Sequence, residues 1–182
     1  LPFPSFYDPT KVGDLFVERG GLVAEEARLF RNRRRIRLAR NDAFQVAAFG
    51  IDCQVTFCSP EASLYVPGAV EDTRRTVEWL YRNLSQISSL FFSLDTHSLF
   101  QIFHPVWWVN EKGKNPDPLT PISADDVRMG RWKSANVKER KRSLLYCEAL
   151  EASGKYMLTI WPYHALLGGV SHSLMPTLME AA

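Results

Sequence analysis

Three short apolar runs stand out along the chain, separated by longer stretches of mixed character. They are residues 44–52 (FQVAAFGID), 87–94 (ISSLFFSL) and 156–161 (YMLTIW). Continuous apolar runs of this length are typical of parallel strands that are covered on both faces. The pattern therefore predicts three buried strands at these positions.

The residues between the runs carry apolar positions at helical spacing. Residues 70–84 repeat them every three or four residues, and Pro67-Gly68 precedes this stretch as a helix start. Residues 134–152 predict a second helix, which Gly154 would end as a C′ glycine. The alternation of strands and helices predicts an α/β fold with a parallel sheet and right-handed crossovers.

Two stretches fall outside this alternation. Residues 1–42 are polar and mixed, are broken by Gly20-Gly21 and predict a short helix at 24–31. Residues 105–133 carry several prolines and glycines. Because long excursions of this kind are uncommon in compact domains, we expect a lid or an interface there.

Composition narrows the class of protein. The 182 residues are 46% hydrophobic and 23% charged, and the net charge of +2 gives no general attraction to nucleic acid or anionic membranes. No apolar run approaches the roughly 18 residues of a membrane span, and residues 1–7 lack the pattern of a signal peptide. Three irregularly spaced cysteines (Cys53, Cys58 and Cys147) indicate no disulfide framework, so we expect a reduced, cytoplasmic protein.

Seven arginines gather between residues 28 and 40. Such a cluster is either a nucleic-acid patch or a solvated face whose cations pair with acids elsewhere. No interleaved aromatic residues and no nucleic-acid motif accompany the arginines. The solvated face is the favoured interpretation, and no nucleic-acid partner is expected.

Polar residues follow each predicted strand at its carboxyl end. Asp52 ends the first, Asp95 and His97 follow the second, and His164 follows the third. Ligands of open α/β sheets bind at this edge, so we expect the four side chains to converge. Taken singly, an Asp at a strand end is usually a cap or turn residue, and a lone His is usually a hydrogen-bonded loop residue.

Three of these residues have the chemistry of a metal site. Asp95 and His97 lie two residues apart, so in extended backbone they point to the same side, and His164 would add a third ligand. Asp/His/His with open positions is the layout of a catalytic metal centre. Zinc is the first expectation, and manganese or iron fits nearly as well. His104 could be a rival ligand, but its neighbours Pro105 and Trp107-Trp108 indicate instead a loop that shapes the pocket.

Three motifs resemble those of the nicotinamidases and related isochorismatase-like cysteine hydrolases. Residues 52–57 (DCQVTF) resemble the family's Asp-x-Gln-x-x-Phe opening, and residues 95–97 (DTH) resemble its Asp-x-His metal motif. Residues 161–164 (WPYH), followed by Gly168-Gly169, resemble its Trp-Pro-x-His segment. The resemblance covers residues 44–182 and implies that residues 1–43 are an N-terminal extension. It also implies a Rossmann-like parallel sheet with helices on both faces, of which this chain supplies the first three strands.

The resemblance also implies an activity and roles for individual residues. The typical reaction hydrolyses nicotinamide to nicotinate and ammonia through an Asp–Lys–Cys triad beside a metal. Asp52 would handle the proton of the nucleophile, and Asp95, His97 and His164 would bind the metal. Phe57 and Trp161, which neighbour the motifs, are the expected substrate-binding residues. A small-molecule amide is the expected substrate.

The family's catalytic lysine and cysteine have no counterpart among residues 1–182. None of the three cysteines fits the nucleophile's place, and Lys155 precedes the third strand at the wrong end of the sheet. We therefore expect residues 44–182 to form the first half of a domain. The other half would come from a second chain or a continuation, because half a sheet exposes an unpaired strand and an apolar face.

Other functions stay open at this point. The protein could act on another small amide, or it could be a non-catalytic scaffold that keeps the fold. The metal motif argues against the vinyl-ether branch of the family, which generally does without that site. We also expect a homo-oligomer.

Overall fold

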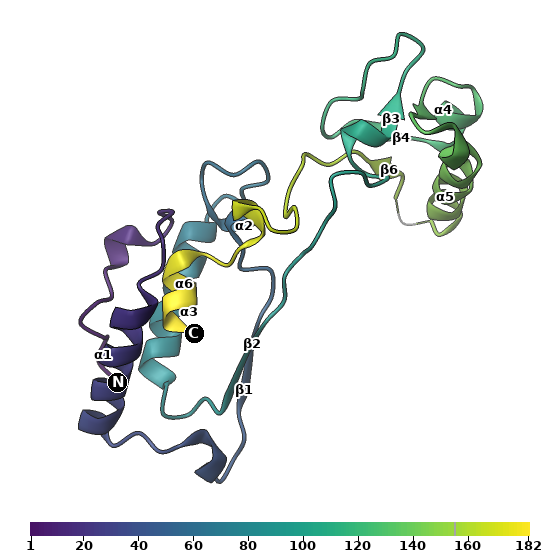
Figure 1. Cartoon of the computed structure of the whole chain (residues 1–182). Coiled ribbons are helices and arrows are strands. Elements are labelled where there is room, and N and C mark those ends of the chain that lie inside the picture. The colour runs from purple at the N-terminus through teal and green to yellow at the C-terminus, as the bar shows by residue number, and fades with distance from the viewer. Residues whose placement is uncertain (155) are drawn as a thin grey trace. The chain divides into compact units, whose positions relative to one another are not determined.

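The computed structural model describes residues 1–154 and 156–182 (Figure 1). Lys155, which the sequence places before the third predicted strand, lies outside the described residues. The chain divides into unit 1, which comprises residues 1–96 and 168–182, and unit 2, which comprises residues 97–167. Each unit has an apolar core of its own. The expected division at residue 43 stays a prediction.

Unit 1 contains the parallel strand pair that the first two apolar runs predict. Strand β1 (Ala47–Gly50) lies beside β2 (Ser89–Phe92), with Ala47 opposite Ser89 and Gly50 opposite Phe92 (Figure 1). The expectation that both faces are buried is wrong, because exposed and half-buried residues alternate along each strand. One face packs on the unit's core and the other carries Phe49 and Phe91 in the open.

Helix α3 (Ala69–Asn83) confirms the helix predicted between the two strands. It begins after Gly68, whose φ of 90° is a left-handed conformation that glycine adopts without strain. Its buried face packs against α2 (Val55–Cys58) and α6 (Pro176–Ala181). Cys58, which we expected in a loop, ends α2 and is buried.

The N-terminal residues pack onto unit 1. They form η1 (Pro9–Lys11), α1 (Gly20–Arg34) and η2 (Ala39–Asn41), so Gly20-Gly21 opens a helix instead of breaking the chain. The rings of Phe6 and Tyr7 lie 6.2 and 5.2 Å from the ring of Tyr81. Arg19 donates from Nε and Nη2 to Glu180 of α6, at 2.9 and 2.6 Å.

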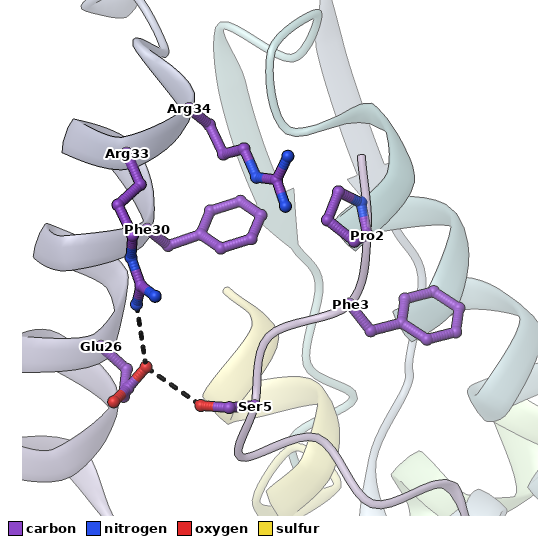
Figure 2. Close-up of a pocket in the computed structure, with 7 residues that line it drawn as sticks. All are labelled: Pro2, Phe3, Ser5, Glu26, Phe30, Arg33 and Arg34. Carbon is purple, nitrogen blue, oxygen red and sulfur yellow. Dashed lines mark hydrogen bonds and ion pairs between the residues drawn. The ribbon is translucent and has the colours of Figure 1, made fainter.

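A cavity of about 400 Å³ lies between the N-terminal segment and α1 (Figure 2). Glu26 joins its two sides, because it accepts a hydrogen bond from Ser5 and faces Arg33 at 3.8 Å. On the same helix Arg28 pairs with Glu25 at 2.6 Å. Exposed arginines that pair with nearby acids fit the solvated face that we favoured for this cluster.

Unit 2 gives regular structure to the stretch that we expected to be a long excursion. Its elements, in chain order, are η3 (Pro105–Trp107), β3 (Trp108–Val109), β4 (Pro121–Ile122), α4 (Ala124–Arg128), β5 (Lys133–Ser134), η4 (Val137–Glu139), α5 (Arg140–Ala152) and β6 (Leu158–Thr159). The second predicted helix thus begins at Arg140, after a strand and a turn. Ser123 caps α4 by accepting from the backbone N–H of Asp126.

The third predicted strand does not extend the parallel pair of unit 1. β6 pairs antiparallel with β4, and β3 pairs antiparallel with β5. The partner of β6, strand β4, comes from residues 105–133. Its Ile122 is fully buried, as are Trp108 and Ile160 of the same core. Strands of two residues carry no readable alternation, so their pairing escaped the sequence pattern. The fold is mixed α/β, with two-stranded sheets in the described residues.

The last short element, η5 (Val170–His172), belongs to unit 1 and precedes α6. No helix among residues 1–154 and 156–182 combines the length and the apolar character that crossing a membrane requires.

Candidate metal centre

Asp95, His97 and His164 come together as the sequence predicted. Each offers one ligand atom, and these atoms all lie within 4.8 Å of one another. His164 is 6% exposed, and the other two side chains are partly buried. The chain therefore contains a possible metal-binding triad, which we call the Asp–His–His triad.

Backbone hydrogen bonds bring the two histidines together. His97 N–H donates to the carbonyl of Ala165 at 3.0 Å, and Leu167 N–H donates to the carbonyl of His97 at 3.0 Å. These bonds form a short parallel bridge between His97 and Leu166. The imidazole rings of His97 and His164 consequently lie 4.7 Å apart, edge to face.

The tautomer of His164 is set by its neighbour. Nδ1 lies 2.7 Å from the carbonyl oxygen of Pro162, which can only accept, so Nδ1 is the donor. In the neutral imidazole the lone pair is therefore on Nε2. Histidines that bind metals are commonly held in this way, with the other ring N–H on a backbone carbonyl.

The donor set fits a divalent transition metal. Ligand atoms on one tetrahedral zinc ion lie about 3.3 Å apart, so the three atoms would approach one another by at most about 1.5 Å on binding a metal. One carboxylate and two imidazoles leave further coordination positions open, as catalytic zinc, manganese and iron sites do. Zinc remains the first expectation for this donor set.

His104, the rival ligand, lies close to the triad but outside it. The side chain is fully buried, its Nδ1 lies 3.0 Å from the carbonyl oxygen of Leu99, and its Nε2 has no hydrogen-bond partner in the described residues. Its ring lies 5.9 and 5.7 Å from those of His97 and His164. Burial lowers the pKa of His104. A neutral imidazole therefore borders the triad.

Asp52 follows β1 in a strained backbone conformation, with φ of 53°. The Asp52 carboxylate accepts a hydrogen bond from Ser93 Oγ at 2.6 Å. The backbone N–H of Asp52 donates to Ser93 Oγ in return, at 3.1 Å. If Asp52 accepts the proton of a cysteine nucleophile, a cysteine sulfur is expected within hydrogen-bond reach of its carboxylate. Within the described chain, its hydrogen-bonding partner is Ser93 instead, and the catalytic role stays a prediction.

The three thiols are poor nucleophiles where they stand. Desolvation by burial raises the pKa of Cys53 and of Cys58, and raises that of Cys147 to about 12. Because the thiolate is the reactive form, each of them is overwhelmingly protonated at neutral pH. This agrees with the expectation that none of the three is the nucleophile.

The two expected substrate-binding residues lie in different surroundings. Phe57 is partly buried and packs against the core of unit 1. Trp161 is 40% exposed, and its ring lies 6.4 Å from that of His164. Trp161 also lines a cavity of about 410 Å³ in unit 2, together with Phe103, Tyr146, Leu150, Tyr156, Met157, Leu158 and Thr159.

Comparison of the chain with protein-family models, curated proteins and solved structures finds no match. The function therefore has to be inferred from the residues and their geometry.

Proposed function

We propose that this chain carries the metal site of a metal-dependent cysteine amidohydrolase of the nicotinamidase kind. The observation that carries the proposal is the convergence of Asp95, His97 and His164, whose ligand atoms all lie within 4.8 Å of one another. The three motifs that resemble the family occur in the expected order. The substrate is nicotinamide or another small amide, and the finer fold assignment is the isochorismatase-like parallel sheet, which would include the β1–β2 pair.

The residues divide the work of such a reaction between them. Asp95, His97 and His164 would hold a divalent ion, which would supply positive charge beside a bound amide or water molecule. Trp161 offers a flat, partly exposed face beside His164, on which an aromatic amide can stack. Asp52, held by Ser93, accepts the proton of the attacking thiol. The reaction also requires a lysine and a nucleophilic cysteine, roles to which none of the described residues is assigned.

Metal binding is the first test. Titration with Co²⁺, followed by its visible absorption, should show about one tightly bound equivalent per chain. Asp95→Asn should weaken binding at least tenfold, because a neutral amide replaces the anionic ligand, whereas Asp117→Asn at an exposed carboxylate should leave it unchanged. Weak binding by the unaltered protein, or equal behaviour of both variants, defeats the proposal.

Turnover is the second test. Ammonia release from nicotinamide, measured on the protein with any chain that co-purifies with it, should fall by at least a hundredfold in Asp52→Asn while the melting temperature barely changes. A variant that hydrolyses nicotinamide at the unaltered rate shows that Asp52 has another role.

A non-catalytic, metal-binding scaffold protein is the second candidate. The raised pKa values of Cys53, Cys58 and Cys147 favour it, because no activated thiol stands in the described residues. The two candidates differ in one outcome. Tight Co²⁺ binding without ammonia release from any small amide identifies the scaffold.

A further inference from the structure

The side chain of Gln54 is fully buried, yet every polar atom of its amide has a partner. Its Oε1 accepts from the backbone N–H of Asp95 at 2.7 Å, and its Nε2 donates to the carbonyl of Asp95 at 2.9 Å. The same Nε2 donates to the carbonyl of His172 at 2.8 Å. Gln54 thus pairs with both backbone groups of the first residue of the triad.

His172 contacts Thr96, the residue that follows Asp95. Its Nε2 lies 2.8 Å from Oγ1 of Thr96, the residue between the two triad members Asp95 and His97. The Thr96 hydroxyl donates to the carbonyl of Leu94 at 3.0 Å. Because the hydroxyl has one hydrogen, its oxygen accepts from His172, so Nε2 of His172 carries a proton.

The segments that carry Gln54 and His172 are themselves joined. Val55 N–H donates to the carbonyl of Ser173 at 2.9 Å, and Met175 N–H donates to that of Cys53 at 3.1 Å. Gln54 and Leu174 form an isolated antiparallel bridge. All of these residues belong to unit 1, so both backbone segments that hydrogen-bond to the Gln54 amide, at Asp95 and at His172, lie in the same unit.

We propose that Gln54 and His172 are positioning residues for the metal site. Together they form a polar frame around the backbone of Asp95 and Thr96, and the frame orients the Asp95 carboxylate for metal binding. The inference rests on the proposed metal site. It assigns a role to Gln54, to which the resemblance of residues 52–57 alone assigned none, and to His172.

The chemistry of the frame requires an amide. An amide presents one acceptor to the N–H of Asp95 and two donor hydrogens to two carbonyls, and a buried group left without these partners is costly. A carboxylate at the same position would face two carbonyl oxygens, and an apolar side chain would satisfy none of the three backbone groups. Outer-shell partners of this kind typically change metal affinity by about 10- to 100-fold.

Gln54→Met tests the frame, because methionine has nearly the same length and no hydrogen-bonding amide. Its Co²⁺ affinity should fall about tenfold or more, measured well below the melting temperature. The matched control is Thr73→Val, which removes a different buried hydrogen bond of unit 1, from Thr73 Oγ1 to the carbonyl of Ala69. The control should lose stability but keep the affinity of the unaltered protein.

Thr96 provides a test that does not depend on a buried substitution, because its side chain is exposed. Thr96→Val removes the hydroxyl and should weaken Co²⁺ binding roughly threefold, the worth of one ordinary hydrogen bond. Thr96→Ser keeps the hydroxyl and should restore the affinity. A loss of fold alone would not separate these two variants.

Amide hydrogen exchange separates failure of the frame from failure of the metal site. The Asp95 N–H is bonded to Gln54, so without metal its exchange should be slow in the unaltered protein and at least tenfold faster in Gln54→Met. Absence of Co²⁺ binding by the unaltered protein overturns the metal site and the inference that rests on it, and protected exchange would then leave Gln54 as a structural clamp only. Normal Co²⁺ binding by both Gln54→Met and Thr96→Val overturns the frame alone.

Discussion

The two units use their strands in opposite ways. In unit 1 the four-residue parallel strands leave Phe49 and Phe91 63% and 52% exposed. The two-residue strands of unit 2 instead contribute Trp108 and Ile122, both 0% exposed, to the core of that unit. The length of a strand therefore does not measure its contribution to stability. What counts is the apolar area that the strand removes from water.

The open face of the β1–β2 pair has a consequence for assembly. The rings of Phe49 and Phe91 stack at 6.4 Å, and Ile51 beyond them is 70% exposed. Contiguous exposed apolar side chains on a sheet are typical of a surface that another element covers. This is the face on which a second copy of the chain would pack.

The largest expected effect lies in the core of unit 2. Trp108→Ala should lower the free energy of unfolding by about 3–5 kcal/mol, because it leaves a large cavity and removes the 2.6 Å bond from Trp108 Nε1 to the carbonyl of Ile102. Thermal unfolding followed by circular dichroism measures it. Trp79→Ala on α3, where the side chain is 49% exposed, is the matched control and should cost less than about 1 kcal/mol. Equal losses would show that the contrast in burial between the two tryptophans does not set stability.

The next effect concerns the ion pair that ties the N-terminal residues to α6 in unit 1. The Glu180 side chain is 3% exposed and Arg19 is 41% exposed, so Glu180→Gln should cost about 2 kcal/mol, less than a fully buried pair. Hydrogen bonds from Arg19 lower the pKa of Glu180. The contribution is therefore complete above the carboxyl's ordinary pKa and is lost as the pH falls through the lowered value.

Acid titration checks this sign. Between about pH 5 and pH 3 the melting temperature of the unaltered protein should fall more steeply than that of Glu180→Gln, which has no carboxyl to titrate at this position. Glu25→Gln, which removes an exposed partner from Arg28, is the control and should parallel the unaltered protein. Parallel curves for all three proteins would contradict the role of the pair.

The sequence predicted some parts of the molecule well and others poorly, for identifiable physical reasons. The helix over residues 70–84 and the parallel pairing of the first two strands follow from long periodic patterns and from Gly68, and both are present. The triad was predicted because Asp95 and His97 are close in sequence and His164 follows an apolar run. The predicted parallel pairing of β6 was wrong. Its partner β4 is only two residues long and lies in a proline-containing stretch, so the sequence pattern does not reveal it. The frame around Asp95 was missed because buried amide contacts leave no periodic trace.

Two neighbouring phenylalanines of β2 offer a smaller and sharper comparison. Phe92 packs on the core of unit 1 and approaches Gly50 so closely that a Cβ there would lie 2.5 Å from its ring, whereas Phe91 faces outward. Phe92→Ala should cost about 1–2 kcal/mol and Phe91→Ala less than about 0.5 kcal/mol. Phe91→Ala should instead reduce self-association in analytical ultracentrifugation. Similar stability losses would show that both faces of the pair are covered in solution.

The last comparison uses the buried thiols as reporters of the opening of each unit. Cys58 is 8% exposed in the core of unit 1 and Cys147 is 1% exposed in that of unit 2, and burial raises the pKa of both thiols. Both should therefore react with a thiol reagent only when their own unit opens, and Cys147 should be the slower. In a Cys53→Ser background, which removes the half-buried third thiol, Trp108→Ala should speed the labelling of Cys147 at least tenfold and leave that of Cys58 nearly unchanged. Mass spectrometry of labelled peptides separates the two sites. Equal acceleration at both would mean that the units unfold as one, and the contrast between their cores would then describe packing without independent stability.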